Sequence, residues 1–126
     1  MGGAGLASTL GDYVNFAEML LNDGNFKGRK VIEPEYVKMM RTPQLPDSVQ
    51  SGSEKWGLGV RVITDESYGR LPVGSFGWSG AYGTHFWVDP VNRVTAVYMK
   101  NSMMFGGAGS MTAVNFEQDV HDSFED

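Results

Sequence analysis

The sequence contains no cysteine and only two histidines, at positions 85 and 121. It therefore has no disulfide, no thiolate nucleophile and no cysteine-based metal site, and two histidines alone do not complete a tetrahedral zinc site. We expect no metal ion and no cofactor.

No apolar run approaches the ~20 residues that span a bilayer, and the start at Met1–Gly5 lacks the basic region and long apolar core of a signal peptide. The compartment, cytoplasmic or periplasmic, stays open.

Basic residues are also scarce. Ten Lys and Arg face fifteen Asp and Glu, which leaves a net charge of -5 that repels a phosphate backbone. Nucleic acid is therefore an unfavourable partner. The 41% hydrophobic content is too high for a disordered chain, and 126 residues suit one compact domain, so we expect a single domain over residues 1–126.

Helical periodicity is present at both ends of the sequence. Apolar residues recur at helical spacing over Thr9–Asn22, where Ser8 or Thr9 supplies the N-cap oxygen and Gly24 ends the helix in the left-handed region. A short helix is predicted over Pro34–Met40, followed by a polar loop, Thr42–Glu54. A final amphipathic helix is predicted over Ser110–Phe124, with Ala113, Phe116, Val120 and Phe124 as its apolar stripe.

The middle of the sequence changes to the period of two that is typical of strands. The predicted strands are Trp56–Ile63, Gly74–Trp78, Thr84–Val88 and Arg93–Asn101. Short connections at Asp65–Gly69 and Asp89–Asn92 make neighbouring strands antiparallel. Both faces of Val94–Met99 are apolar, which predicts a central strand covered on each side. The expected fold class is α+β: an antiparallel β-meander of three to four strands with N-terminal helices and a C-terminal helix packed on the sheet.

A serine nucleophile needs a base within hydrogen-bonding distance, and the sequence offers few pairs. No serine is followed three positions later by lysine, and Gly77–Ala81 lacks the second glycine of a nucleophile elbow. Ser79, His85 and Asp89 could form a Ser-His-Asp set, but a strand histidine points to one face and nothing in the sequence holds Ser79 beside it. We interpret His85 as a partly exposed strand histidine.

Paired carboxylates are the other candidate for acid–base chemistry. They are Glu33 with Glu35, Asp119 with Asp122, and the terminal Glu125 with Asp126. None of these pairs has flanking aromatic residues that would remove it from water, so we interpret them as solvated surface acids.

One stretch combines aromatic residues with glycines. Ser75–Pro90 alternates them along two predicted strands, where glycine lets a substrate or another backbone approach closely. The stretch contains Trp78-Ser79-Gly80 and resembles the third conserved element of the serine β-lactamase-like family, which includes class C β-lactamases, DD-peptidases and related esterases. Gly2–Gly24, Trp56–Val60 and Phe86–Pro90 resemble the neighbouring family segments. The resemblance covers nearly the whole sequence but only the C-terminal part of the family's domain.

The resemblance implies roles for five residues. Ala81 would offer its backbone N–H as one half of an oxyanion hole. Ser79 would hold a polar group of the substrate or assist proton movement. Trp78 would replace the cationic residue of true β-lactamases, which favours ester or small peptide substrates over β-lactams, and Gly80 and Tyr82 would complete the substrate-binding set.

The Ser-x-x-Lys helix of the family is missing, and Tyr13-Val14-Asn15 matches the Tyr-x-Asn element only formally. We therefore expect a C-terminal fragment of a β-lactamase/esterase-like serine hydrolase that is inactive alone. It would take a small ester, amide or β-lactam only when N-terminal sequence completes it. The alternative is a non-catalytic binding or oligomerisation module, with Met39-Met40 and Met103-Met104 as a contact surface. A sheet face without its usual cover also predicts a homo-oligomer.

Overall fold

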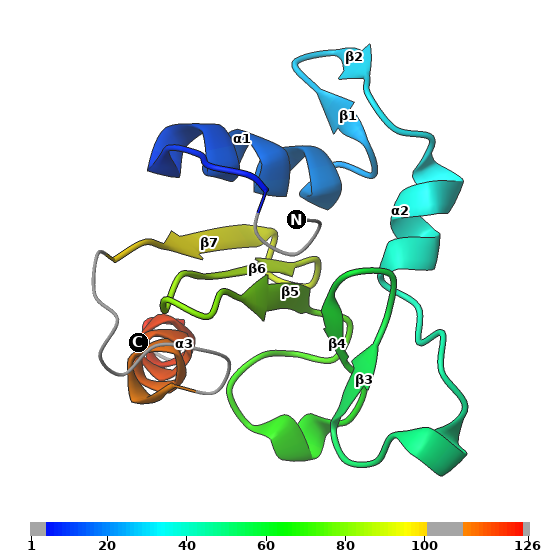
Figure 1. Ribbon diagram of the computed structural model, residues 1–126, viewed down its shortest axis with the longest axis vertical. Helices are drawn as coiled ribbons and strands as arrows, with labels where there is room; N and C mark the ends of the chain where they lie inside the picture. The colour runs from blue at the N-terminus through cyan, green and yellow to red at the C-terminus, as the bar shows by residue number, and fades with distance from the viewer. Residues whose placement is uncertain (1–4, 101–109, 125–126) are drawn as a thin grey trace.

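A five-stranded antiparallel sheet lies between two helices in the computed structural model, which describes residues 5–100 and 110–124. Helix α1 (Leu10–Leu21) covers one face, and helix α3 (Met111–Asp122) covers the other (Figure 1). The expected α+β meander with a C-terminal helix on the sheet is confirmed. The covering role of α1 opposite α3 was not predicted.

Each strand of the sheet pairs with the next strand in the sequence. The strands are β3 (Glu54–Trp56), β4 (Arg61–Ile63), β5 (Phe76–Ser79), β6 (His85–Asp89) and β7 (Val94–Tyr98). The predicted count of three to four was too low because Trp56–Ile63 is not one strand. The Gly57 amide donates to the Val60 carbonyl at 2.9 Å, and Gly59 has a φ of +73°, so the chain turns between β3 and β4.

Strand β7 differs from its prediction in one respect. Among the described residues it lies at the edge of the sheet, not at its centre, because its only paired neighbour there is β6. Its apolar faces are nevertheless both covered, as predicted. Helix α1 packs on one face, and the Phe116 ring of α3 lies 5.6 Å from the Tyr98 ring. Helices on both faces therefore explain why every position of the strand tolerates apolar residues.

Capping residues fix the ends of the two long helices. The Thr9 side chain accepts a hydrogen bond from the Asp12 amide, and the Ser110 side chain accepts one from Ala113. Gly24 adopts a φ of +90°, and a β-carbon there would collide with the Ile32 carbonyl. Glycine is therefore required where the chain leaves α1.

The predicted loops contain several short elements. A two-stranded hairpin, β1 (Asn25–Phe26) with β2 (Arg29–Lys30), follows α1, and α2 (Pro34–Met40) has the predicted bounds. The segment Thr42–Glu54 holds the 3₁₀ turn η1 (Asp47–Val49). The expected hairpin loop Asp65–Gly69 holds η2 (Glu66–Tyr68), capped by Asp65, which accepts from the Ser67 amide.

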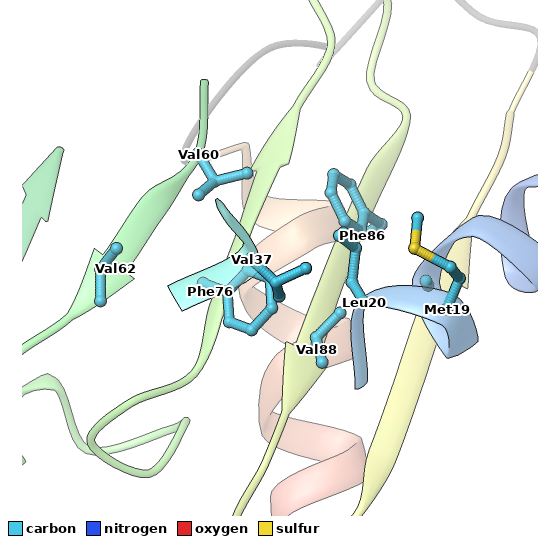
Figure 2. Close-up of a cluster of buried hydrophobic side chains, with 9 residues drawn as sticks. Met19, Leu20, Val37, Val60, Val62, Phe76, Phe86 and Val88 are labelled. Atoms are coloured by element: carbon cyan, nitrogen blue, oxygen red, sulfur yellow. The ribbon is translucent and has the colours of Figure 1, made fainter. Parts of the chain in front are cut away.

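Two hydrophobic clusters lie on opposite faces of the sheet. The first joins α1 and α2 to the sheet and contains Ala17, Met19, Leu20, Val37, Val60, Val62, Phe76, Phe86 and Val88 (Figure 2). Tyr13 packs against it, with its ring 5.0 Å from that of Phe86, as expected for a residue of the apolar stripe. The second contains Ile63, Tyr68, Leu71, Trp87 and Ala96, with Phe116 and Val120 of α3 packed on it.

Two expectations about the surface differ from the structure. Phe124 lies beyond the end of α3 and is 53% exposed, so it is not part of the packed stripe. Met39 is exposed whereas Met40 packs against the first cluster, so the pair does not form one contact surface; Met103-Met104 lie outside the described residues.

Within residues 5–100 and 110–124, no helix has the length and apolar character needed to cross a membrane.

Candidate functional site

The register of two neighbouring strands brings Ser79 and His85 together. Ser79 ends β5, His85 begins β6, and the two residues are direct partners in the antiparallel ladder. Directly opposite residues project to the same face of a sheet. The Ser79 Oγ atom lies 2.7 Å from His85 Nδ1, and both residues are buried. The expectation of a partly exposed His85 with nothing to hold Ser79 beside it was therefore wrong.

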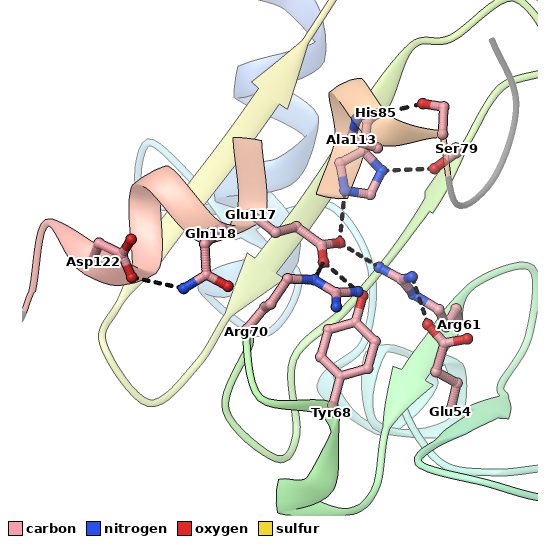
Figure 3. Close-up of polar contacts among 11 residues, drawn as sticks. Glu54, Arg61, Tyr68, Arg70, Ser79, His85, Ala113, Glu117, Gln118 and Asp122 are labelled. Atoms are coloured by element: carbon pink, nitrogen blue, oxygen red, sulfur yellow. Dashed lines mark hydrogen bonds and ion pairs between the residues drawn. The ribbon is translucent and has the colours of Figure 1, made fainter. Parts of the chain in front are cut away.

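The other ring nitrogen of His85 contacts helix α3. His85 Nε2 lies 2.9 Å from Glu117 Oε1, so the three side chains form a continuous hydrogen-bonded series (Figure 3). Asp89, which the sequence offered as the acid of a Ser-His-Asp set, does not contact His85 in this series. Its carboxylate accepts from the Val91 and Asn92 amides and holds the turn between β6 and β7.

Glu117 is the centre of a larger polar cluster on this face. Its carboxylate accepts from Arg61 Nη2 at 2.8 Å, Arg70 Nε at 3.0 Å and the Tyr68 hydroxyl at 2.6 Å, in addition to His85. Burial acts to raise the pKa of Glu117, but hydrogen bonds from His85 and Tyr68 and the charge of Arg61 outweigh it and lower that pKa to about 2. The carboxylate is therefore ionised at neutral pH.

The remaining members of the cluster hold one another in place. Burial raises the pKa of Tyr68 to about 12, helped by the hydrogen bond that its hydroxyl donates to Glu117. The Arg70 guanidinium lies 4.3 Å from the centre of the Tyr68 ring, a cation–π distance. Arg61 also pairs with Glu54 at 2.7 Å on the solvent side. Two guanidiniums are thus matched by two carboxylates.

Sequence reasoning missed Glu117, Arg61, Tyr68 and Arg70. One signal was available for Glu117. It lies four residues after Ala113 and three before Val120, so it occupies the apolar stripe of its own helix, where a carboxylate needs partners. The acids that were considered behave differently: Glu33 pairs with exposed Lys30, and Asp119 and Asp122 are exposed.

The residues of the Trp-Ser-Gly motif surround the start of the β5–β6 turn. Trp78 is half-buried, and its ring lies 4.5 Å from that of Trp56. The Gly80 amide donates to the Thr84 carbonyl at 2.8 Å, which closes the turn. Ala81 and Tyr82 are exposed at its tip, where the Tyr82 side chain is 62% exposed. Of the five predicted site residues, Ser79 is thus buried beside His85, Trp78 and Gly80 are half-buried, and Ala81 and Tyr82 are exposed.

A cavity of about 730 Å³ adjoins this polar cluster. It opens beside β3, the η2 loop and α3, and its lining includes Trp56, Trp78, Arg61, Arg70, His85 and Glu117. Ser79 is only 6% exposed and is not part of that lining. The series Ser79–His85–Glu117 resembles a nucleophile, base and acid in order, but its serine is not presented to the cavity. No group of three or more metal-ligating side chains occurs within the described parts of the chain.

Comparison with known proteins assigns the fold to a family. The sequence matches the Beta-lactamase family over residues 1–118, and the chain belongs to this family. Protein Rv1367c of Mycobacterium tuberculosis is 38% identical over 111 residues, which cover 77% of this chain and 28% of that protein. A protein of Escherichia coli K12, provisionally assigned as a D-alanyl-D-alanine carboxypeptidase, is 32% identical over 105 residues, covering 79% of this chain and 23% of that one.

Solved structures agree with this assignment. EstCE1, a hydrolase with promiscuous acyltransferase activity, superimposes with a TM-score of 0.65 at 21% identity, covering 85% of this chain and 29% of that chain. A penicillin-binding protein homologue from Caulobacter crescentus gives a TM-score of 0.54 at 25% identity over 68% of this chain and 24% of that chain. The chain thus spans about a quarter of the length of each of these four proteins. The expected family resemblance is confirmed.

Proposed function

We propose that this chain is the C-terminal part of a β-lactamase/esterase-like serine hydrolase and supplies its third motif strand. In this role, β5 carries Trp78 and Ser79, Gly80 follows directly after it, and the Ala81 N–H contributes one half of the oxyanion hole. Trp78 and Tyr82 contact the acyl substrate, a small ester, amide or β-lactam. The other half of the hole and the nucleophile come from sequence outside this chain, so the chain alone is inactive.

The position of Ser79 is the observation that carries this proposal. Ser79 lies at the end of a strand, 6% exposed, with its hydroxyl hydrogen-bonded to His85. An attacking serine must reach the substrate carbonyl, which this arrangement does not favour. No serine of the sequence, Ser79 included, has a lysine three positions later. A supporting role for Ser79 therefore fits better than that of nucleophile.

Two proteins test the proposal: the 126-residue chain, and a chimera in which this chain replaces the matching segment of the M. tuberculosis relative, assayed beside that relative. The substrates are a chromogenic short-chain ester and a chromogenic cephalosporin. We expect turnover by the chimera and none by the chain alone. An inactive chimera of an active parent, or turnover by the chain alone that Ser79→Ala abolishes, would contradict the proposal.

The oxyanion role of Ala81 requires its own variant, because a backbone N–H is not removed by changing the side chain. Proline has no N–H, so Ala81→Pro in the chimera should lower kcat by about 100-fold, the usual effect of losing one oxyanion donor. Ala81→Gly, which keeps the backbone N–H at the same position, is the control variant. Equal losses in the two variants would argue against an oxyanion role for Ala81.

The alternative role, an oligomerisation module, rests on a different observation. Strand β7 is at the edge of the described sheet although both of its faces are covered, and an edge strand can pair with a strand of another chain. This role predicts that the chain self-associates and that the chimera is inactive, whereas the hydrolase role predicts an active chimera.

A further inference from the structure

The cavity beside the Glu117 cluster combines aromatic side chains with cations. Trp56 and Trp78 both line it, as an edge-to-face pair with ring centres 4.5 Å apart, and Trp56 is 39% exposed. The volume of about 730 Å³ lies within the range of sites that hold small organic molecules. Aromatic rings give such a site a large apolar contact area, so the cavity suits a ligand with an apolar body.

The charged side chains of the lining leave one positive charge unmatched within the cavity. Among the described residues that line it, three are cations and two are carboxylates: Lys55, Arg61 and Arg70 against Glu54 and Glu117. The acid that pairs with Lys55, Asp47, is not part of this lining, and its side chain is 82% exposed. Exposed ion pairs are weak, so Asp47 offsets little of that charge. The chain as a whole carries a net charge of -5, so the positive excess belongs to the cavity and not to the overall composition.

Arg70 is the lining arginine that can bind a further anion. Its Nε donates to Glu117 at 3.0 Å, and its guanidinium lies between that carboxylate and the Tyr68 ring (Figure 3). Within the described part of the chain no second carboxylate pairs with Arg70, whose side chain is 26% exposed. Its two terminal nitrogens therefore retain N–H donors, in the forked arrangement that fits a carboxylate. Arg61 differs, because its terminal nitrogens donate to Glu54 and Glu117 and its side chain is 11% exposed.

We propose that this cavity binds a small monocarboxylate with an aromatic or large apolar body, whose carboxylate pairs with the Arg70 guanidinium while its body packs against Trp56 and Trp78. Lys55 adds a second cation to the same lining. One carboxylate neutralises the unmatched positive charge, whereas a phosphate monoester carries about two negative charges and exceeds it. The site needs neither Ser79 nor turnover, so it stands independently of the proposed function.

Nuclear magnetic resonance of the ¹⁵N-labelled 126-residue chain at neutral pH tests the site, with benzoate as the probe. The reporters are the indole N–H signals of Trp56 and Trp78. The third tryptophan, Trp87, is buried in the second cluster outside the cavity lining, so its signal is the internal reference. We expect benzoate to shift the two reporters with a Kd of about 1 mM, an ordinary affinity for so small a molecule. Benzamide, which lacks the charge, and acetate, which lacks the ring, should each bind about tenfold more weakly or less.

Three outcomes with the wild-type chain would overturn the proposal. They are no saturable shift of either reporter, equal affinities for benzoate and benzamide, and tighter binding of phenyl phosphate than of benzoate. None of these measurements depends on a variant that folds.

Variants then locate the carboxylate. Arg70→Gln should weaken benzoate binding about tenfold and leave benzamide binding unchanged, and Lys55→Gln should weaken benzoate about threefold, because it removes charge without removing the fork. Arg41→Gln is the matched control, since Arg41 is similarly exposed and also pairs with one carboxylate, Asp23, but lies outside the lining. An unchanged Trp87 signal shows that Arg70→Gln keeps the fold. Equal benzoate affinities in Arg70→Gln and Arg41→Gln would overturn the assignment of the carboxylate to Arg70.

Discussion

Glu117 connects the C-terminal helix to three separate parts of the chain. Its partners come from β4, the η2 loop and β6, and their sequence positions are 32 to 56 residues away from it. Such a carboxylate does not stabilise the protein by its charge alone, because removing it from water is costly. Its contribution to the free energy of unfolding therefore depends on the hydrogen bonds and ion pairs that it makes with these partners.

Glu117→Gln should therefore destabilise the protein by about 3 kcal/mol, because it leaves the partly buried charges of Arg61 and Arg70 without their shared carboxylate. Urea unfolding monitored by tryptophan fluorescence measures the change. Asp119→Asn removes an exposed acid from the same helix and should change stability by less than about 0.5 kcal/mol. Equal effects of the two variants would show that the cluster does not anchor the helix.

Glu117 also predicts how stability depends on pH. Its pKa is lowered from 4.5 to about 2 in the folded protein, so its contribution is complete above about pH 4.5, where the carboxylate is ionised in both states. Below pH 4.5 the unfolded chain binds the proton first, and stability falls until the folded state is protonated near pH 2. The loss is on the order of 3 kcal/mol. Unfolding midpoints from pH 6 to 2 measure it, and Glu117→Gln should show a correspondingly smaller decline.

The pairing of β5 with β6 is the element on which the candidate site depends. This pairing places Ser79 opposite His85, and it requires Gly77, because a β-carbon there would collide with the backbone carbonyl of Phe86. Close approach of two backbones explains the glycine within a strand, where glycine is otherwise unfavourable.

Gly77→Ala should destabilise the protein by about 2 kcal/mol or more, because one of the two strands must shift. Gly11→Ala is the matched control. A β-carbon at Gly11 in α1 has no atom within 4 Å, so this variant should instead stabilise the protein by about 0.5 kcal/mol through helix propensity. Thermal unfolding of both variants measures whether each one lowers or raises stability. A Gly77→Ala variant that is more stable than the wild type would contradict the close approach of the β5 and β6 backbones.

At the scale of the whole molecule, helices cover both faces of the sheet, and β7 lies at its edge within residues 5–100 and 110–124. An unpaired edge favours pairing with a second copy. We therefore expect the 126-residue chain to elute as a dimer or larger species whose fraction grows with concentration, as measured by size-exclusion chromatography with light scattering. A monomer at every concentration would contradict this prediction.

The sequence predicted the elements whose signals are local. Helix α1 was predictable from its apolar spacing, Thr9 and Gly24, and the meander from short connections between strands, because each signal lies within a few residues. The break between β3 and β4 was missed because a turn at Gly57–Val60 interrupts an otherwise continuous strand composition.

The sequence by itself determined the family, the order of the elements and the motif residues Trp78–Tyr82, because these are properties of neighbouring residues. Only the tertiary structure decided that Ser79 faces His85 and that His85 faces Glu117. The first contact depends on strand register, and the second on how α3 packs across the sheet. Ser79 and His85 are six residues apart across a short turn, where a slip of one residue in register would point the two side chains to opposite faces. His85 and Glu117 are 32 residues apart on different elements, and no local pattern gives the distance between them.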